Sequence, residues 1–181
     1  MALKATIFKA DLQIADMDRH YYASHALTIA QHPSETDERM MVRLVAFAHH
    51  AHEHLAFARG LSEADEPDLW QKDLTGAIEH WIDVGLPDEK RILKASGRAS
   101  HVTIYAYGGR AVTLWWAALS AKLSRLKNVT VISLAPAVTL ALAKQAQRNM
   151  QLGCTIEDGV LWLNGESESV QVMFDVLQAA A

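Results

Sequence analysis

Strand-like and helix-like patterns alternate from residue 76 to residue 150, and this alternation restricts the chain to the α/β class. Strands are expected at residues 76–85, 101–108 and 129–134, and helices at residues 86–100, 109–128 and 135–150. Half of the 181 residues are apolar and 21% are charged, a balance typical of a globular domain with a substantial core. We therefore predict one domain over residues 1–181, with a central β-sheet covered by helices.

The two ends of the chain carry strand patterns without intervening helices. Apolar residues alternate from Leu3 to Ile14, and their phase slips near Phe8, which predicts a β-bulge in a long strand. Residues 21–31 are typical of the returning strand of a hairpin. Residues 151–177 indicate three strands, with Asp158–Gly159 in a hairpin turn. We expect additional β-hairpins at the N- and C-terminal ends.

A long helix is predicted from about Ser34 to Ala58. Ser34 suits its N-cap, and Gly60 suits the position just beyond its last turn. Apolar residues that recur at helical spacing should face the core: Met41, Leu44, Ala48, Ala51 and Leu55. Glu38 lies at the edge of this apolar stripe, so we expect its side chain to be partly removed from solvent.

The net charge and the cysteine content restrict the classes of binding partner and the cellular compartment that we expect. The net charge of -4 argues against a strongly electrostatic nucleic-acid binder, although a local basic surface is compatible with it. Cys154 is the single cysteine, which excludes an internal disulfide and suits a reducing cytoplasm. The sequence has no apolar stretch long enough to span a bilayer, and the first residues lack a signal-peptide core. We therefore predict a cytoplasmic protein with no membrane partner.

Four histidines lie between His49 and His54, and two of them could bind zinc. His50 and His54 are one helical turn apart, which is a chelating spacing. The metalloprotease pattern that starts at His52 requires a second histidine at position 56, where the chain has alanine. We favour an exposed helix face for this segment over a metal site.

The stretch from Glu66 to Ala95 places acids before and on a predicted strand, and cations on the helix that follows. Hydrolysis of a phosphodiester needs a divalent cation that polarises the phosphoryl oxygen and activates water. Magnesium takes carboxylate oxygens as ligands, and a lysine can neutralise the charge that develops at phosphorus. The spacing of these acids and cations alone does not show whether they form a metal-dependent catalytic site or are ordinary charged residues that face solvent.

The segments "HPSETDERMMVRL", "DEPDLW", "WIDVGLPDEKRILKA" and "TIEDGVLWL" resemble the YaeQ family of bacterial proteins. The resemblance extends from "MALKATIFKA" to the end of the chain, which implies a single YaeQ-like domain over residues 1–181. It also implies a fold similar to the PD-(D/E)XK nucleases. In that fold a mixed central sheet is flanked by helices, adjacent strands supply metal-binding acids, and the preceding helix supplies another acid.

The resemblance implies a catalytic set of Glu38, Asp68, Asp83 and Lys94. Glu38 matches the helix acid, Pro67–Asp68 matches the proline-acid pair, and Asp83 matches the acid of the second strand. The implied metal ligands are Asp68, Asp83 and the backbone carbonyl of Val84. The expected metal is Mg²⁺, with Mn²⁺ as the alternative.

The chain departs from the superfamily pattern at Gly85, where a lysine is expected. A lysine from the following helix could replace it, because Lys90 and Lys94 are one turn apart. We favour Lys94, because Lys90 is next to Asp88 and Glu89 in the first turn. The choice between these two lysines stays open at this stage.

Three functions from different classes are compatible with these residues. The first is a magnesium-dependent phosphodiesterase that acts on nucleic acid. The second is a non-catalytic module that binds nucleic acid or protein on a degenerate nuclease fold, which Gly85 and the net acidity support. The third is a structural role for the acids, each paired with a neighbouring cation. If nucleic acid is the partner, the predicted basic rim is Lys90, Arg91, Lys94, Arg98 and Arg110.

Overall fold

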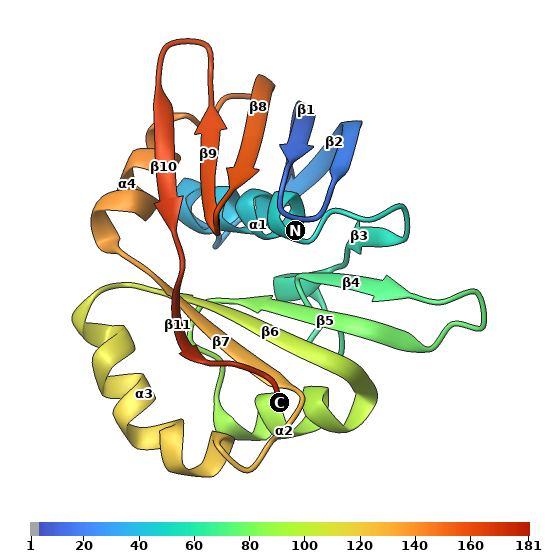
Figure 1. Cartoon of the computed structure of the whole chain (residues 1–181), viewed down its shortest axis with the longest axis vertical. Helices are drawn as coiled ribbons and strands as arrows, with labels where there is room; N and C mark the ends of the chain where they lie inside the picture. The colour runs from blue at the N-terminus through green and yellow to red at the C-terminus, as the bar shows by residue number, and fades with distance from the viewer. Residues whose placement is uncertain (1–3) are drawn as a thin grey trace. The chain divides into compact units, whose positions relative to one another are not determined.

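The computed structural model describes residues 4–181, which form eleven strands and four α-helices (Figure 1). These residues divide into two compact units, each built from separate stretches of the chain. The first unit contains the described part of Met1–His49 together with Ala137–Phe174. The second unit contains His50–Pro136 together with Asp175–Ala181. Leu3, the first residue of the predicted N-terminal strand, lies outside the described residues.

The first unit contains a mixed five-stranded sheet in the order β10-β9-β8-β1-β2. Its strands are β1 (Thr6–Asp16), β2 (Tyr21–Gln31), β8 (Asn149–Glu157), β9 (Val160–Asn164) and β10 (Ser169–Met173). β1 pairs antiparallel with β2 and parallel with β8, so the hairpins predicted at the two chain ends belong to one sheet. Apolar residues of β1 and β8 lie in register and are buried, as in the pair Leu12 and Leu152.

The predicted bulge near Phe8 is wrong. The β1–β2 register runs without a shift from Thr6 to Asp16. Phe8 is buried, whereas Ile7 is 43% exposed and Ala5 is exposed. The apparent change of phase arose because apolar residues occupy the outer face at the start of the strand. The predicted turn at Asp158–Gly159 is confirmed, since both residues have positive φ and join β8 to β9.

The predicted long helix is shorter than its sequence pattern indicated. α1 spans Asp37–His49, and the hydroxyl oxygen of Thr36 accepts a hydrogen bond from the Arg39 N–H at 3.1 Å. Ser34 does not hold the predicted cap position, because its hydroxyl lies 2.6 Å from a ring nitrogen of His32. Thr36 is therefore the side chain that binds a free N–H at this end of the helix.

The chain after His49 leaves the helix and forms a strand. β3 spans Leu55–Phe57 and pairs antiparallel with β4, so sheet pairing overrides the helical spacing of the apolar residues. Gly60 begins a short 3₁₀ helix and does not end α1. The burial prediction for the five apolar residues is nevertheless confirmed, because each of them is at most 6% exposed.

The second unit contains a mixed six-stranded sheet in the order β11-β7-β6-β5-β4-β3. Its other strands are β4 (Leu69–Lys72), β5 (Ile78–Val84), β6 (Ala99–Tyr107), β7 (Val129–Leu134) and β11 (Asp175–Gln178). Strands β5, β6 and β7 are parallel, as expected when helices connect consecutive strands. The α/β prediction is confirmed, with two mixed sheets in place of one.

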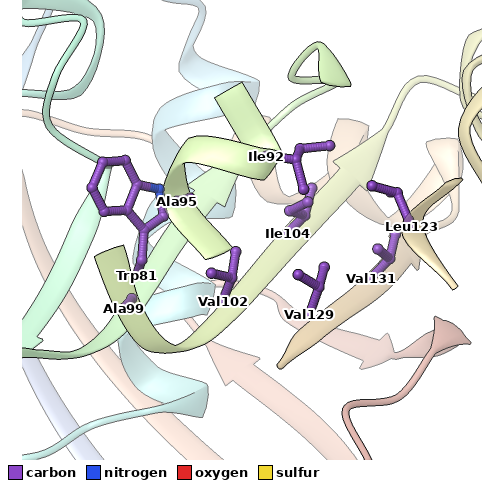
Figure 2. Packing of buried hydrophobic residues seen from close by; sticks show 9 residues of the cluster. All are labelled: Trp81, Ile92, Ala95, Ala99, Val102, Ile104, Leu123, Val129 and Val131. Carbon is purple, nitrogen blue, oxygen red and sulfur yellow. The ribbon is translucent and has the colours of Figure 1, made fainter. Parts of the chain in front are cut away.

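Helices α2 (Glu89–Arg98) and α3 (Arg110–Leu123) pack against the second sheet. Figure 2 shows their shared core, in which Ile92 and Ala95 of α2 and Leu123 of α3 meet the sheet. The strand residues of this core are Trp81, Ala99, Val102, Ile104, Val129 and Val131. All of these side chains are buried, so the apolar side of α2 is already covered within the second unit.

In the C-terminal part of the chain, the helix is shorter than predicted and there is one more strand. α4 spans Pro136–Lys144, and the chain is extended again from Asn149, where β8 begins. The tail forms four strands where three were predicted, because β11 follows β10 and pairs with β7. Among residues 4–181, no helix combines the length and the hydropathy needed to cross a membrane.

Candidate functional site

Strands β4 and β5 bring two of the predicted acids together. Asp68 immediately precedes β4, and its backbone N–H donates to the Ile82 carbonyl at 3.1 Å. Oδ2 of Asp68 accepts a hydrogen bond from the Val84 N–H at 2.8 Å. Asp83 lies between these two β5 residues and is 3% exposed, whereas Asp68 is 2% exposed. The two carboxylates therefore come from neighbouring positions at the ends of adjacent strands, as the resemblance implied.

Asp83 is held by an arginine. Nε of Arg91 donates to Oδ2 of Asp83 at 2.8 Å, and a terminal nitrogen donates to Oδ1 at 3.0 Å. This two-point geometry matches the planar guanidinium to both carboxylate oxygens. The same guanidinium also donates to the carbonyls of Ala64 at 2.8 Å and Glu66 at 2.9 Å. The Asp83 carboxylate, which was predicted to bind a metal ion, is therefore paired with the guanidinium of Arg91.

The start of α2 explains why Arg91 points towards Asp83. Asp88 is the N-cap, and its side chain accepts the Arg91 N–H at 2.8 Å, so the first helical turn is fixed. Arg91 follows Asp83 by eight residues, across the short connection between β5 and α2. Its guanidinium also lies 5.8 Å from the ring centre of Trp81, which buries the stem of the side chain.

Gly60 is a site residue that the sequence analysis did not identify. It has a φ of +47°, and a β-carbon there would lie 2.6 Å from Oδ1 of Asp68. Such a distance is shorter than any ordinary contact, so a side chain at this position would displace the Asp68 carboxylate. The only signal in the sequence was a glycine a few residues before Pro67–Asp68, which the helix pattern explained as a helix end.

Gly85 stands where the resemblance led us to expect a lysine, and its backbone conformation favours glycine. Its φ is +109°, a region that residues with a β-carbon rarely adopt, although a β-carbon there would meet no other atom within 4 Å. The Gly85 N–H donates to the Tyr105 carbonyl at 2.9 Å, which fixes this strand exit. Lysine at this position would strain the backbone by about 1–3 kcal/mol.

The two candidate replacement lysines lie on the exposed side of α2. The ammonium of Lys94 forms an ion pair with Asp65, a residue of the loop before Pro67. This hydrogen bond from Lys94 lowers the pKa of the Asp65 carboxyl below its usual value. Lys90 is exposed and makes no ion pair within residues 4–181. The Lys94 ion pair in the structure is therefore with a surface acid.

Glu38 lies on α1 in the first unit, whereas Asp68 and Asp83 lie in the second. Its side chain is half-buried, and Oε2 accepts a hydrogen bond from the Thr139 hydroxyl at 3.2 Å. The expectation of partial burial is confirmed. Its catalytic role stays a prediction. Across residues 4–181, no group of three histidine, cysteine, aspartate or glutamate side chains is arranged to hold a metal ion.

The remaining residues of the predicted basic rim have different environments. Arg98 donates to the Asp65 carbonyl at 2.7 Å, and its guanidinium lies 5.1 Å from the ring centre of Trp81. Arg110 is exposed at the first position of α3, after two glycines with positive φ. Arg91 is the rim residue whose charge is directed inward, to Asp83.

The histidine segment does not form the exposed helix face that the sequence favoured. α1 ends at His49, whose ring stacks on Phe174 with 4.0 Å between ring centres. His50 is half-buried and forms a 2.6 Å hydrogen bond with the Tyr105 hydroxyl. Its ring also meets His80 edge-on at 4.7 Å. The spacing argument failed because the helix ends inside the segment, so His50 and His54 do not share a helical face.

Comparison with known proteins identifies similar chains over nearly the whole length. The family model described as YaeQ protein matches residues 1–174. YaeQ of Salmonella typhi is 44% identical over 178 residues, which is 98% of this chain and 98% of that protein. The crystal structure of YaeQ from Xanthomonas axonopodis pv. citri is 48% identical, with a TM-score of 0.94 over 97% of this chain and 99% of that chain. The crystal structure of YaeQ from Pseudomonas syringae is 38% identical, with a TM-score of 0.93 over 97% of each chain.

Proposed function

The chain belongs to the YaeQ family, and we propose that it is a non-catalytic binding module in which Arg91 takes the place of a metal cation beside the Asp68–Asp83 acid pair. A divalent metal in such a site would neutralise the carboxylates and activate water. A guanidinium also neutralises a carboxylate, but it has no open coordination position and cannot activate water. The acid pair then holds the loop, β5 and α2 together.

The observation that carries this proposal is the four hydrogen bonds of the Arg91 guanidinium. Two go to Asp83, and the others go to the carbonyls of Ala64 and Glu66. An arginine whose donors are used in this way is bound to its own protein and is poorly placed to leave for a metal ion. Gly85 and the Lys94–Asp65 ion pair agree with this view, because neither supplies a lysine to the carboxylates.

Thermal melting in the presence of metals tests the proposal. We expect millimolar Mg²⁺ or Mn²⁺ to leave the melting temperature of the unmodified protein unchanged, because Arg91 already satisfies Asp83. In Arg91→Met the carboxylates lose this cation, and either metal should then raise the melting temperature. Arg91→Met/Asp83→Asn is the matched control and should not respond. A rise in the unmodified protein that Asp83→Asn removes would contradict the proposal.

The second candidate is a Mg²⁺-dependent phosphodiesterase acting on nucleic acid, with Glu38, Asp68, Asp83 and Lys94 as its catalytic residues. Its support is the adjacency of two buried acids at the ends of neighbouring strands. It requires Arg91 to release Asp83 when metal and substrate bind. Metal-dependent cleavage of single-stranded, duplex or branched substrates, lost in Asp83→Asn, would establish this function in place of the first.

The chemistry of Cys154 bears on the compartment. The thiol is 2% exposed, and burial raises its pKa to about 12, so it is a poor nucleophile and forms no internal disulfide. We propose that the module acts in the reducing cytoplasm, where a buried free thiol is stable. Oxidant treatment of the folded protein should leave this thiol unmodified.

A further inference from the structure

Positive charge is concentrated in one stretch of this acidic chain. Residues 90–136 contain eight of the seventeen lysine and arginine residues and no aspartate or glutamate. The whole chain has a net charge of -4, so the remaining residues are strongly acidic by comparison. A concentrated charge of one sign creates a local potential that the net charge does not reveal.

The fold places two groups of these cations side by side. The Lys122 ammonium pairs with Glu89 at 2.8 Å, so the end of α3 contacts the beginning of α2. Asn128 hydrogen-bonds Ser96 and the Ala99 carbonyl at 2.7–3.0 Å, next to the end of α2. Lys122 and Asn128 therefore contact the beginning and the end of α2. Both segments cover the same core of the second unit (Figure 2).

The outer side of α2 is a row of cations. Lys90, Lys94 and Arg98 recur at every fourth residue, which puts them on one side of the helix, about 6 Å apart along its axis. All three are exposed. Leu93, 48% exposed, is the apolar residue beside this row. The opposite side of α2, with Ile92 and Ala95, is buried in the core.

A second row lies at the end of α3 and in the connection to β7. Lys122, Arg125 and Lys127 are all exposed. We define the α2–α3 basic face as the two rows together: Lys90, Lys94, Arg98, Lys122, Arg125 and Lys127. The second row was not part of the rim predicted from sequence, because the rim was chosen by its proximity in sequence to Asp83.

The acids near this face leave an excess of positive charge. Asp65 pairs with Lys94, and Glu89 pairs with Lys122, in ion pairs whose side chains are at least a third exposed. Exposed ion pairs of this kind are weak and exchange easily for another anion. Asp88 is also exposed, and its carboxylate caps α2. Lys90, Arg125 and Lys127 form no ion pair within residues 4–181.

We propose that the α2–α3 basic face binds the sugar–phosphate backbone of a nucleic acid without reading its bases. This step rests on the proposed function as a binding module and names its partner. Rows of lysine and arginine attract phosphates whatever the sequence, and release of counterions drives the binding. Contacts to phosphates position a protein on a nucleic acid but carry no sequence information.

A nucleic acid fits this face better than a lipid bilayer does. A helix that binds at a membrane surface inserts its apolar side between the lipids, with its cations around that side. In α2 the apolar residues Ile92 and Ala95 are already buried against the sheet, and Leu93 is the one large apolar residue of this helix that is exposed. The phosphates along a nucleic-acid strand are a better match for the cations of the α2–α3 basic face.

Fluorescence anisotropy with labelled 20-nucleotide probes of single-stranded DNA, duplex DNA and single-stranded RNA tests this inference. We expect affinity to fall as salt rises, with a log–log slope of about -3 to -5 if four to six phosphates are neutralised. Lys90→Glu/Arg125→Glu should weaken binding at least about 10-fold and reduce the slope by about two. Both residues are exposed and unpaired within residues 4–181, so the fold should be retained, as near-ultraviolet circular dichroism can verify.

Two controls reverse cations elsewhere, and the first of them matches the double charge reversal of the test variant. Lys9→Glu/Lys144→Glu alters two exposed cations of the first unit, and Arg110→Glu alters the far end of α3, about 18 Å from Lys122 along the helix axis. Neither control should weaken binding as much. Equal losses in the controls, binding that ignores salt, or binding of anionic phospholipid vesicles but no probe would overturn the inference. If the probes bind but are also cleaved with Mg²⁺, the binding face stands and the non-catalytic function fails.

Discussion

The buried carboxylate of Asp83 requires a positively charged partner among its neighbours. Its side chain is 4% exposed, so an ionised carboxylate there requires a partner that offsets the loss of water. Arg91 provides this partner with a fork that few other side chains can reproduce. Gly60 and Gly85 act at the same scale, because each has a positive φ that a side chain would strain, and Gly60 also leaves room for the Asp68 carboxylate.

A double-mutant cycle measures the value of this pair. Arg91→Met leaves the Asp83 carboxylate buried without its cation and should lower the free energy of unfolding by about 2–4 kcal/mol. In Arg91→Met/Asp83→Asn the unpaired charge is gone, so much of this loss should be recovered. Urea denaturation of the four proteins gives the coupling energy. A coupling energy near zero would mean that the pair does not stabilise the fold.

His49 makes a prediction about pH. Burial, assisted by the charge of Arg19, lowers the pKa of His49 to about 4 from the usual 6.5. The unfolded chain therefore binds a proton near pH 6.5, whereas the folded chain binds it only near pH 4. Stability should be lost as the pH falls through this window, by about 3 kcal/mol from this residue.

Urea denaturation at several pH values tests this sign and size. His49→Phe keeps a ring that can stack on Phe174 and should remove most of the loss between pH 6.5 and pH 4. His54→Gln is the control, because the His54 side chain is 41% exposed and should follow the unmodified protein. If His49→Phe loses stability to the same extent as the control, His49 is not the group that titrates.

At the scale of elements, strands from the two ends of the chain pair with strands that lie far away in the sequence. β11 closes one edge of the second sheet by pairing with β7. The amide nitrogen of Gln178 donates to the carbonyls of Leu123, Leu126 and Val129 at 2.9–3.4 Å, which ties β11 to the end of α3. Leu123 is the last residue of α3 and Val129 is the first residue of β7, so this side chain links the end of α3 to the start of β7.

Gln178→Ala should lower the free energy of unfolding by about 1–3 kcal/mol, because three partly buried carbonyls each lose a hydrogen bond from this amide. Gln171→Ala on β10 is the matched control, since Gln171 is exposed and should change stability by less than about 0.5 kcal/mol. Removal of residues 175–181 should go further and leave β7 as an unprotected edge. Size-exclusion chromatography would then show self-association, and a monomeric truncated protein would contradict this role for β11.

The sequence predicted elements well where the signal is local. The strand and helix alternation through β5, α2, β6, α3 and β7 follows from periodicity and turn residues alone. The end of α1 and the strand β3 were missed, because pairing of β3 with β4 depends on residues far along the chain. The β1–β8 pairing that unites the two ends was missed for the same reason.

The candidate site was also predicted only in part: the neighbouring acids were expected, but the residues that contact them were not. The adjacency of Asp68 and Asp83 follows from neighbouring strands and was implied by the resemblance. The partner of Asp83 was not predictable, because Lys90, Arg91 and Lys94 all lie on the helix that follows it, and only the helix phase fixed by Asp88 decides which one faces it. The approach of Gly60 to Asp68 also depends on a loop whose shape has no periodic signal.

At the scale of the whole molecule, the chain passes between its two units three times, after His49, Pro136 and Phe174. Most of the second unit is one continuous stretch, His50–Pro136, and it can pair its strands before synthesis ends. The hairpin of β1 and β2 is made first, but its partner β8 is made late. At ordinary translation rates, the stretch from Pro136 to Phe174 takes about 2–8 seconds to emerge. During that interval the first sheet lacks three of its strands, so the edge of β1 that pairs with β8 has no partner until the last part of the chain has been made.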